Sequence, residues 1–143
     1  MKNEKNINIE MSKFLEASMI YTTDCSGSYV PQFESLQDLI KKCYKSPENK
    51  CVDGRTFCYA LNSSLKKIIK ENLKIGESYP LKAYSFFIFY SPLNSSTDKK
   101  SNIIEISEGI FKNCSSITGG EHFINIAESY GVINVQFEVC RGK

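Results

Sequence analysis

The chain has 143 residues, of which 41% are hydrophobic and 24% are charged. This length suffices for one hydrophobic core, and the composition is close to the globular average, which excludes a wholly disordered chain. The net charge of +2 does not require a nucleic acid or an anionic membrane as partner. We therefore expect one domain over residues 1–143, with residues 1–6 forming a disordered tail.

The first 33 residues give weak structural signals. Apolar residues alternate with polar ones over Ile7–Met11, which predicts a short strand. Ser12–Tyr21 fits the spacing of a helix and that of a strand, and the β-favouring residues at 20–23 favour the strand. Glycine and proline in Asp24–Phe33 predict a loop.

Two helices are predicted in the middle of the chain. Ser35 and Asp38 have the spacing of a capping box, with Asp in the place of Glu. Apolar residues then recur at helical spacing until Ser46-Pro47, which ends the helix. A second helix is predicted over Thr56–Leu73, where the polar triplet Asn62–Ser64 is the expected point of interruption.

The second half of the chain predicts strands. Leu81–Tyr90 is the most apolar and aromatic run and predicts a central strand. A strand follows at Asn102–Ser107, and His122–Glu128 with Val132–Cys140 predicts a hairpin. Gly109–Gly120 is expected to be irregular. The order of elements predicts an α+β domain, a mostly antiparallel sheet with two helices packed on it.

The predicted central strand carries two tyrosines whose side chains point to the same face of the sheet. Alternation places Tyr84 and Tyr90 on the row that also holds Lys82, so their polar ends are expected to reach solvent or a ligand groove. Tyr84 and Tyr90 are therefore the candidates for an aromatic binding surface.

The sequence shows neither a secretory leader nor an apolar segment long enough to span a bilayer. This predicts a cytoplasmic protein without membrane contact. The six cysteines could pair in 15 ways in a secreted protein. The lack of a leader favours reduced thiols instead.

The segment Asp24-Cys25-Ser26-Gly27 resembles the nucleophile segment of the bacterial cell-wall cysteine endopeptidases, which have a papain-like core. This resemblance covers four residues and implies Cys25 as nucleophile, activated at a helix N-terminus, with His122 as base. Pro31 departs from the family, because it lies where the nucleophile helix should continue. A cysteine hydrolase using Cys25 and His122 is thus the alternative function.

The sequence does not predict a metal or another cofactor. Cys43, Cys51 and Cys58 lie near one another in sequence, but they do not form the close C-x₂₋₄-C pair of structural zinc sites. Cys43 falls on the apolar stripe of the first predicted helix, where a buried free thiol is ordinary.

A nucleic-acid site is a further alternative. The region 41–74 holds nine basic residues against three acidic ones. Four lysines fall largely on one side of the second predicted helix, where they could contact phosphates while Tyr or Phe stack on bases. They are Lys66, Lys67, Lys70 and Lys74. The small net charge favours a solvated helix face instead.

The favoured hypothesis is a small, non-enzymatic binding module that acts through a macromolecular partner. A protein partner is expected rather than a nucleic acid, as for an accessory protein, an inhibitor or an effector. Four observations favour this hypothesis: a complete set of core elements, a single histidine, the lack of a recognisable catalytic set and one locally basic helical region.

Overall fold

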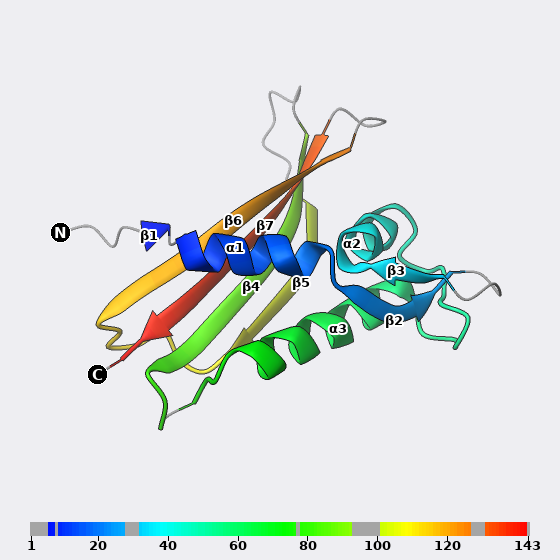
Figure 1. The fold of residues 1–143 in the computed structure, drawn as a ribbon. Helices are drawn as coiled ribbons and strands as arrows, with labels where there is room; N and C mark the ends of the chain where they lie inside the picture. Colours follow the sequence, from blue (N-terminus) through cyan, green and yellow to red (C-terminus); the bar gives the residue numbers. More distant parts are fainter. Residues whose placement is uncertain are drawn as a thin grey trace. The chain divides into compact units, whose positions relative to one another are not determined.

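The computed structural model describes residues 6–7, 9–27, 32–76, 78–92, 101–126 and 131–142 (Figure 1). Its internal contacts divide the chain into two compact units. The sheet unit comprises residues 1–15 and 74–143, and the helical unit comprises residues 16–73. The predicted tail at 1–6 lies outside the described residues except for Asn6, which belongs to a strand. The prediction of a single domain stays a prediction.

The sheet unit is built on five strands in the order β1-β6-β7-β4-β5. The two-residue β1 pairs with β6 in parallel, and the other neighbours are antiparallel. This confirms the α+β class and the mostly antiparallel sheet. The strands are β1 (Asn6–Ile7), β4 (Leu81–Pro92), β5 (Ser101–Glu108), β6 (Ser116–Ile126) and β7 (Gly131–Arg141).

An aromatic cluster holds the sheet unit together. Phe137 on β7 stands opposite Phe86 on β4, with their ring centroids 5.4 Å apart. Phe14 comes from helix α1 (Ile9–Met19), and its ring centroid lies 5.5 Å from that of Phe137. Figure 1 shows the first part of α1, residues 9–15, lying over the sheet. Gly120 permits this close approach, since a Cβ there would lie 2.7 Å from the backbone nitrogen of Ser12.

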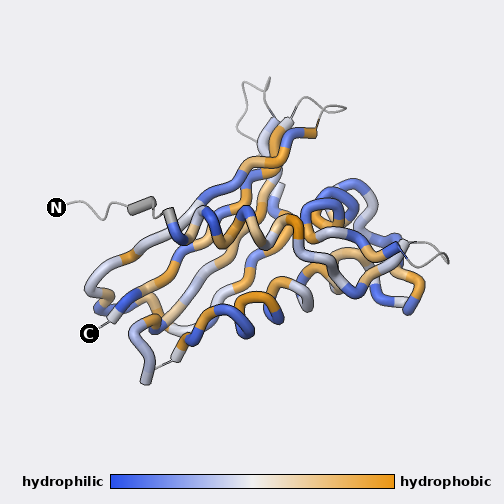
Figure 2. The backbone as a smooth tube through the Cα atoms, in the orientation of Figure 1, coloured by the Kyte–Doolittle hydropathy of each residue, from blue (hydrophilic) through white to orange (hydrophobic). Residues whose placement is uncertain are grey.

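The helical unit contains the end of α1, the antiparallel ribbon of β2 (Thr22–Ser26) and β3 (Phe33–Ser35), and two further helices. These are α2 (Leu36–Lys45) and α3 (Phe57–Asn72), as predicted. The side chain of Ser35 caps α2 by accepting a hydrogen bond from the Asp38 backbone at 3.1 Å. Figure 2 shows hydrophobic and hydrophilic residues alternating along α3. None of the described helices is long and apolar enough to cross a membrane.

All six cysteines form disulfides, and each disulfide lies within one unit. They join Cys25 to Cys51 and Cys43 to Cys58 in the helical unit, and Cys114 to Cys140 in the sheet unit. The prediction of reduced thiols is therefore wrong. The sequence concealed this pairing because it depends on how helices pack: the stripes of α2 and α3 bring two Cα atoms to 4.8 Å.

Other local predictions are also wrong. Helix α1 occupies most of the two segments predicted as strands over Ile7–Met11 and Ser12–Tyr21. Its buried residues Met11, Leu15 and Met19 recur every four positions, so burial of a helical stripe outweighed the β-favouring residues at its end. The expected loop over 24–33 includes parts of β2 and β3. The predicted irregular region 109–120 ends inside β6, and α3 continues through residues 62–64 without interruption.

Candidate functional site

The two candidate tyrosines are buried. Tyr84 is 2% exposed and its hydroxyl donates a hydrogen bond to Glu108 Oε1 at 2.8 Å, while Tyr90 is 8% exposed, with its ring over Gly131. The expectation that their polar ends reach solvent is therefore wrong, while a binding role of these positions stays a prediction. The physical reason is packing on this face of the sheet: the Tyr84 ring centroid lies 6.1 Å from that of Phe137, which Phe14 of α1 also contacts, and the Tyr90 ring packs against Gly131.

Tyr84 gives the fold a sensitivity to alkaline pH. Burial raises the pKa of Tyr84, and the hydrogen bond to Glu108 raises it further. The unfolded tyrosine loses its proton near about pH 10, while the folded one keeps it, so the contribution to stability is complete below that pH and is lost above it. We expect the unfolding free energy, measured in urea, to fall between about pH 9 and about pH 11. The fall should be shallower in Tyr84→Phe.

The control for this experiment is Tyr59→Phe, because Tyr59 is 63% exposed. Its pH dependence should follow that of the wild type. If the unfolding free energy of Tyr84→Phe falls with pH as steeply as that of the wild type, Tyr84 is not the source of the alkaline sensitivity.

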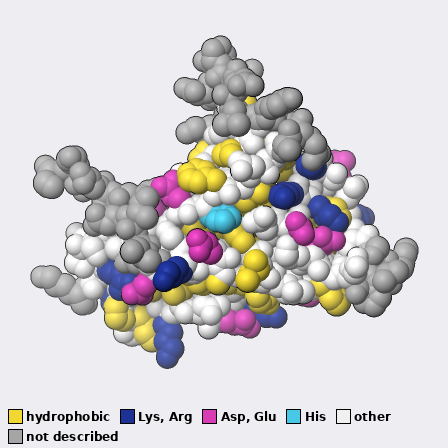
Figure 3. Space-filling view, turned by 45° about the horizontal axis from the view of Figure 1, so that its top comes forward, with side chains coloured by type: hydrophobic (Ala, Val, Ile, Leu, Met, Phe, Trp, Pro, Cys, Tyr) yellow, Lys and Arg dark blue, Asp and Glu magenta, His cyan; other side chains and the backbone are white. Residues whose placement is uncertain are grey.

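The structure removes the chemistry expected of Cys25. Its sulfur is bonded to that of Cys51 and its side chain is fully buried, so it holds no thiolate in this form. His122 is half-buried on β6, and Figure 3 shows its side chain at the surface of the molecule. The zinc alternative loses its ligands in the same way, since Cys43 is bonded to Cys58. No metal-binding cluster of His, Cys, Asp and Glu occurs among the described residues.

The four candidate lysines are exposed, as predicted. Lys66, Lys67 and Lys70 lie on α3, and Lys74 follows two residues after the helix ends. The tyrosines that were expected to stack on bases are buried in the sheet, however. Tyr84 and Tyr90 therefore cannot stack on bases in this structure, and the nucleic-acid alternative stays a prediction.

One pocket lies wholly within the helical unit, between the β2–β3 ribbon and α3. Its volume is about 290 Å³. Its walls combine two aromatic residues, two opposite charges and several hydroxyl groups, which is a composition suited to binding. These are Tyr21 and Phe33, Asp24 and Lys67, and the hydroxyl residues Thr22, Ser63 and Ser64.

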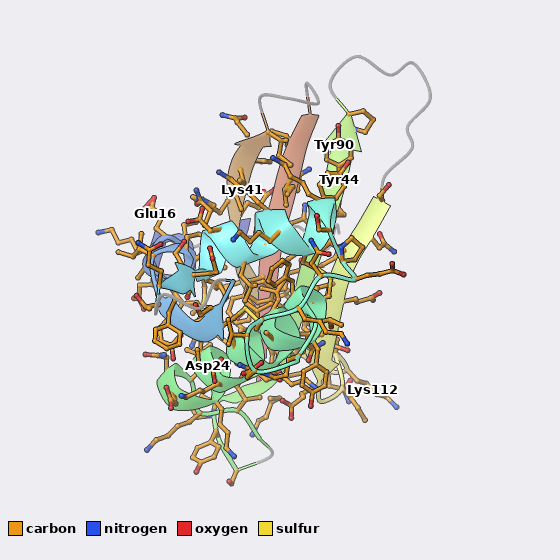
Figure 4. The ribbon with its side chains drawn as sticks, turned by 90° about the vertical axis from the view of Figure 1, so that its right-hand side faces the viewer. Glu16, Asp24, Lys41, Tyr44, Tyr90 and Lys112 are labelled. Carbon is orange, nitrogen blue, oxygen red and sulfur yellow. A yellow bond between two sulfur atoms is a disulfide. The ribbon has the colours of Figure 1, made fainter. Side chains whose placement is uncertain are left out.

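Asp24, the acidic residue in the pocket lining, shares an arginine with a second carboxylate. Arg55 donates hydrogen bonds to Asp53 Oδ2 at 2.8 Å and to Asp24 Oδ1 at 2.9 Å. The two carboxylates raise the pKa of Arg55, and its guanidinium lowers the pKa of Asp53. One positive charge thus faces two negative ones. Figure 4 shows Asp24 on β2, beside α3.

A second candidate surface lies at one end of the sheet unit. The loop 109–115 joins β5 to β6 there and is fixed to β7 in two ways. The disulfide between Cys114 and Cys140 anchors it, and the backbone and side chain of Ser115 both donate hydrogen bonds to the Arg141 carbonyl, at 2.7 and 3.0 Å. Gly109 begins the loop with φ 81°, a conformation that favours glycine.

This loop presents an apolar pair to solvent: Ile110 is 73% exposed and Phe111 is 38% exposed. Cations lie at the same end of the sheet, and Figure 4 shows the Lys112 side chain extending away from the ribbon. We call this region the sheet-end surface, defined by Tyr79, Lys82, Ile110, Phe111, Lys112 and Arg141.

The chain matches no protein-family model and no curated protein sequence. Sequence reasoning missed Ile110 and Phe111 because the segment was treated as irregular. The available signal was an apolar pair between Gly109 and Asn113, where turn residues predict an exposed loop.

Proposed function

We propose that this chain is a non-enzymatic binding protein that acts through a protein partner carrying acidic groups. The observation that carries the proposal is the sheet-end surface, where a loop fixed by a disulfide exposes Ile110 and Phe111. The hydrolase alternative has no comparable support, since the sulfur of Cys25 is already bonded.

The apolar pair supports a protein partner because exposed large hydrophobic residues at neighbouring positions gain free energy when they enter a pocket on a partner. The fixed loop adds to this gain. Its anchors at Cys114 and Ser115 reduce the conformational entropy that would be lost on binding.

The cations around the apolar pair support acidic groups on the partner. Lys82, Lys112 and Arg141 lie at this end of the sheet with Glu108, so basic side chains outnumber that one carboxylate. A partner that presents carboxylates would be steered to this surface, and wrong partners with positive charge would be repelled.

The three disulfides support folding in an oxidising compartment. The proposal therefore departs from the cytoplasmic location expected from the sequence, which depended on reduced thiols. A partner in the same oxidising compartment is the consistent choice.

Peptide selection tests this function. The oxidised protein is used to select short random peptides displayed on phage, and the enriched peptides are synthesised. We expect peptides that combine acidic residues with an aromatic or aliphatic one. Their affinity, measured by fluorescence anisotropy, should fall about 30-fold or more for Ile110→Glu combined with Phe111→Glu, since central apolar anchors contribute most of the binding energy.

The matched control is Phe123→Glu, which also places a charge at an exposed aromatic position, 56% exposed, in the same unit. It should leave the affinity unchanged. Peptides without acidic enrichment, or equal affinity for the double variant, would contradict the proposal. A second experiment uses phosphatidylcholine vesicles that contain phosphatidylserine. If the wild-type protein sediments with these vesicles and the double variant does not, the surface binds a membrane and the proposal of a protein partner is overturned.

A further inference from the structure

We infer that the pocket of the helical unit binds a small zwitterion, a molecule of the free α-amino acid class with an ammonium and a carboxylate group. This inference goes beyond the proposed function, since the pocket lies in the helical unit and the sheet-end surface in the other unit. It depends on the opposite charges and the aromatic residues that line one small space.

Lys67 supplies the positive side. It lines the pocket from α3, its side chain is exposed, and no ion pair joins it to another residue of the described ranges. Its ammonium group is therefore available to a ligand carboxylate. Lys66 and Lys70 on the same helix do not line the pocket, which distinguishes Lys67 from its neighbours.

Asp24 supplies the negative side. Its Oδ1 atom accepts a hydrogen bond from Arg55, but that guanidinium is shared with Asp53. The three groups together keep one negative charge, which is −1 from each carboxylate and +1 from the arginine. A carboxylate has lone pairs on both oxygens, so Asp24 can also accept hydrogen bonds from a ligand ammonium group.

Hydroxyl groups complete the polar lining. Thr22, Ser63 and Ser64 line the pocket, and within the described part of the chain no hydrogen bond engages their side chains. Ser64 is 5% exposed, and its hydroxyl can donate a hydrogen bond to a ligand carboxylate or accept one from a ligand ammonium group. Thr23 is different, because its hydroxyl already donates to the Glu34 carbonyl at 2.8 Å.

The size and the aromatic walls select the ligand class. Tyr21 and Phe33 give the pocket an apolar side, which fits an apolar side chain on the ligand. A volume of about 290 Å³ is at the small end for ligand pockets and suits a single amino acid. Residual charges of both signs favour a zwitterion over an ion with a single charge.

The probes are L-phenylalanine and two analogues that each lack one charge, 3-phenylpropionate and 2-phenylethylamine. Binding to the full, oxidised chain is followed by heteronuclear NMR titration. We expect shift changes at the amides of Thr22, Phe33, Ser63 and Lys67. L-Phenylalanine should bind at least about tenfold more tightly than either analogue, because each missing charge removes a charge-assisted hydrogen bond.

Two variants test the assigned charges, each with a control of the same chemical change outside the pocket. Lys67→Met should lower the affinity for L-phenylalanine about tenfold, and Lys66→Met should leave it unchanged. Asp24→Asn should also lower this affinity, and Asp38→Asn should leave it unchanged. The inference is overturned if L-phenylalanine binds no more tightly than its analogues, or if neither pocket variant weakens it. It is equally overturned if no shift occurs with any probe at about 10 mM.

Discussion

Removing the disulfide between Cys25 and Cys51, by changing both residues to alanine, is expected to lower the unfolding free energy by about 2–5 kcal/mol. This bond closes a loop with a sequence separation of 26, and without it the unfolded chain regains the conformational freedom that the bond removed. Both cysteines are buried, so the loss of packing adds to the effect. The free energy is measured by urea denaturation followed by circular dichroism.

The chain offers a matched comparison. The bond between Cys114 and Cys140 has the same separation of 26 but lies in the sheet unit. Each double variant should therefore lower hydrogen-exchange protection mainly in its own unit. An unfolding free energy equal to that of the wild type after removal of both disulfides would refute the prediction. A native mass without the deficit of six hydrogens that three disulfides require would refute the pairing itself.

Phe137→Ala is expected to lower the unfolding free energy by about 3–5 kcal/mol. Phe137 is fully buried, and its ring centroid lies 5.4–6.1 Å from those of Phe14, Tyr84 and Phe86. Truncation leaves a cavity at the contact between α1, β4 and β7, which neighbouring rings can refill only partly. The measurement is again the urea midpoint and its slope.

Phe123→Ala removes the same atoms from an exposed site on the neighbouring strand β6. It should change the unfolding free energy by no more than about 0.5 kcal/mol. Phe137→Leu should lie between the two, since it keeps part of the buried volume. Equal costs for the two alanine variants would show that Phe137 is not the centre of this core.

Several elements could be predicted from the sequence because they depend on local signals. Ser35 and Asp38 predicted the start of α2, and regular apolar spacing predicted α3. Alternation predicted most of β5 and β7 and part of β6, and apolar aromatic content predicted β4. The polar residues of Asn94–Ser101 predict a loop, and this segment lies outside the described residues except for Ser101, which begins β5.

The candidate site residues depended on information that local patterns do not carry. Lys66, Lys67 and Lys70 are exposed on α3 as expected, but only Lys67 of the three lines the pocket. Tyr84 and Tyr90 have polar ends that predict exposure, but the packing of Tyr84 on Phe137 and of Tyr90 on Gly131 buries both. Local sequence patterns do not single out Asp24, because its contact with Arg55 spans 31 positions.

The sequence by itself determined the α+β class, because hydrophobic periodicity and capping are properties of neighbouring residues. The tertiary structure decided the disulfides, the burial of Tyr84 and the exposure of Ile110 and Phe111. These depend on which segments meet in space. A cysteine cannot show from its neighbours in sequence whether another cysteine lies within bonding distance, and that distance turned the predicted nucleophile Cys25 into a structural cross-link.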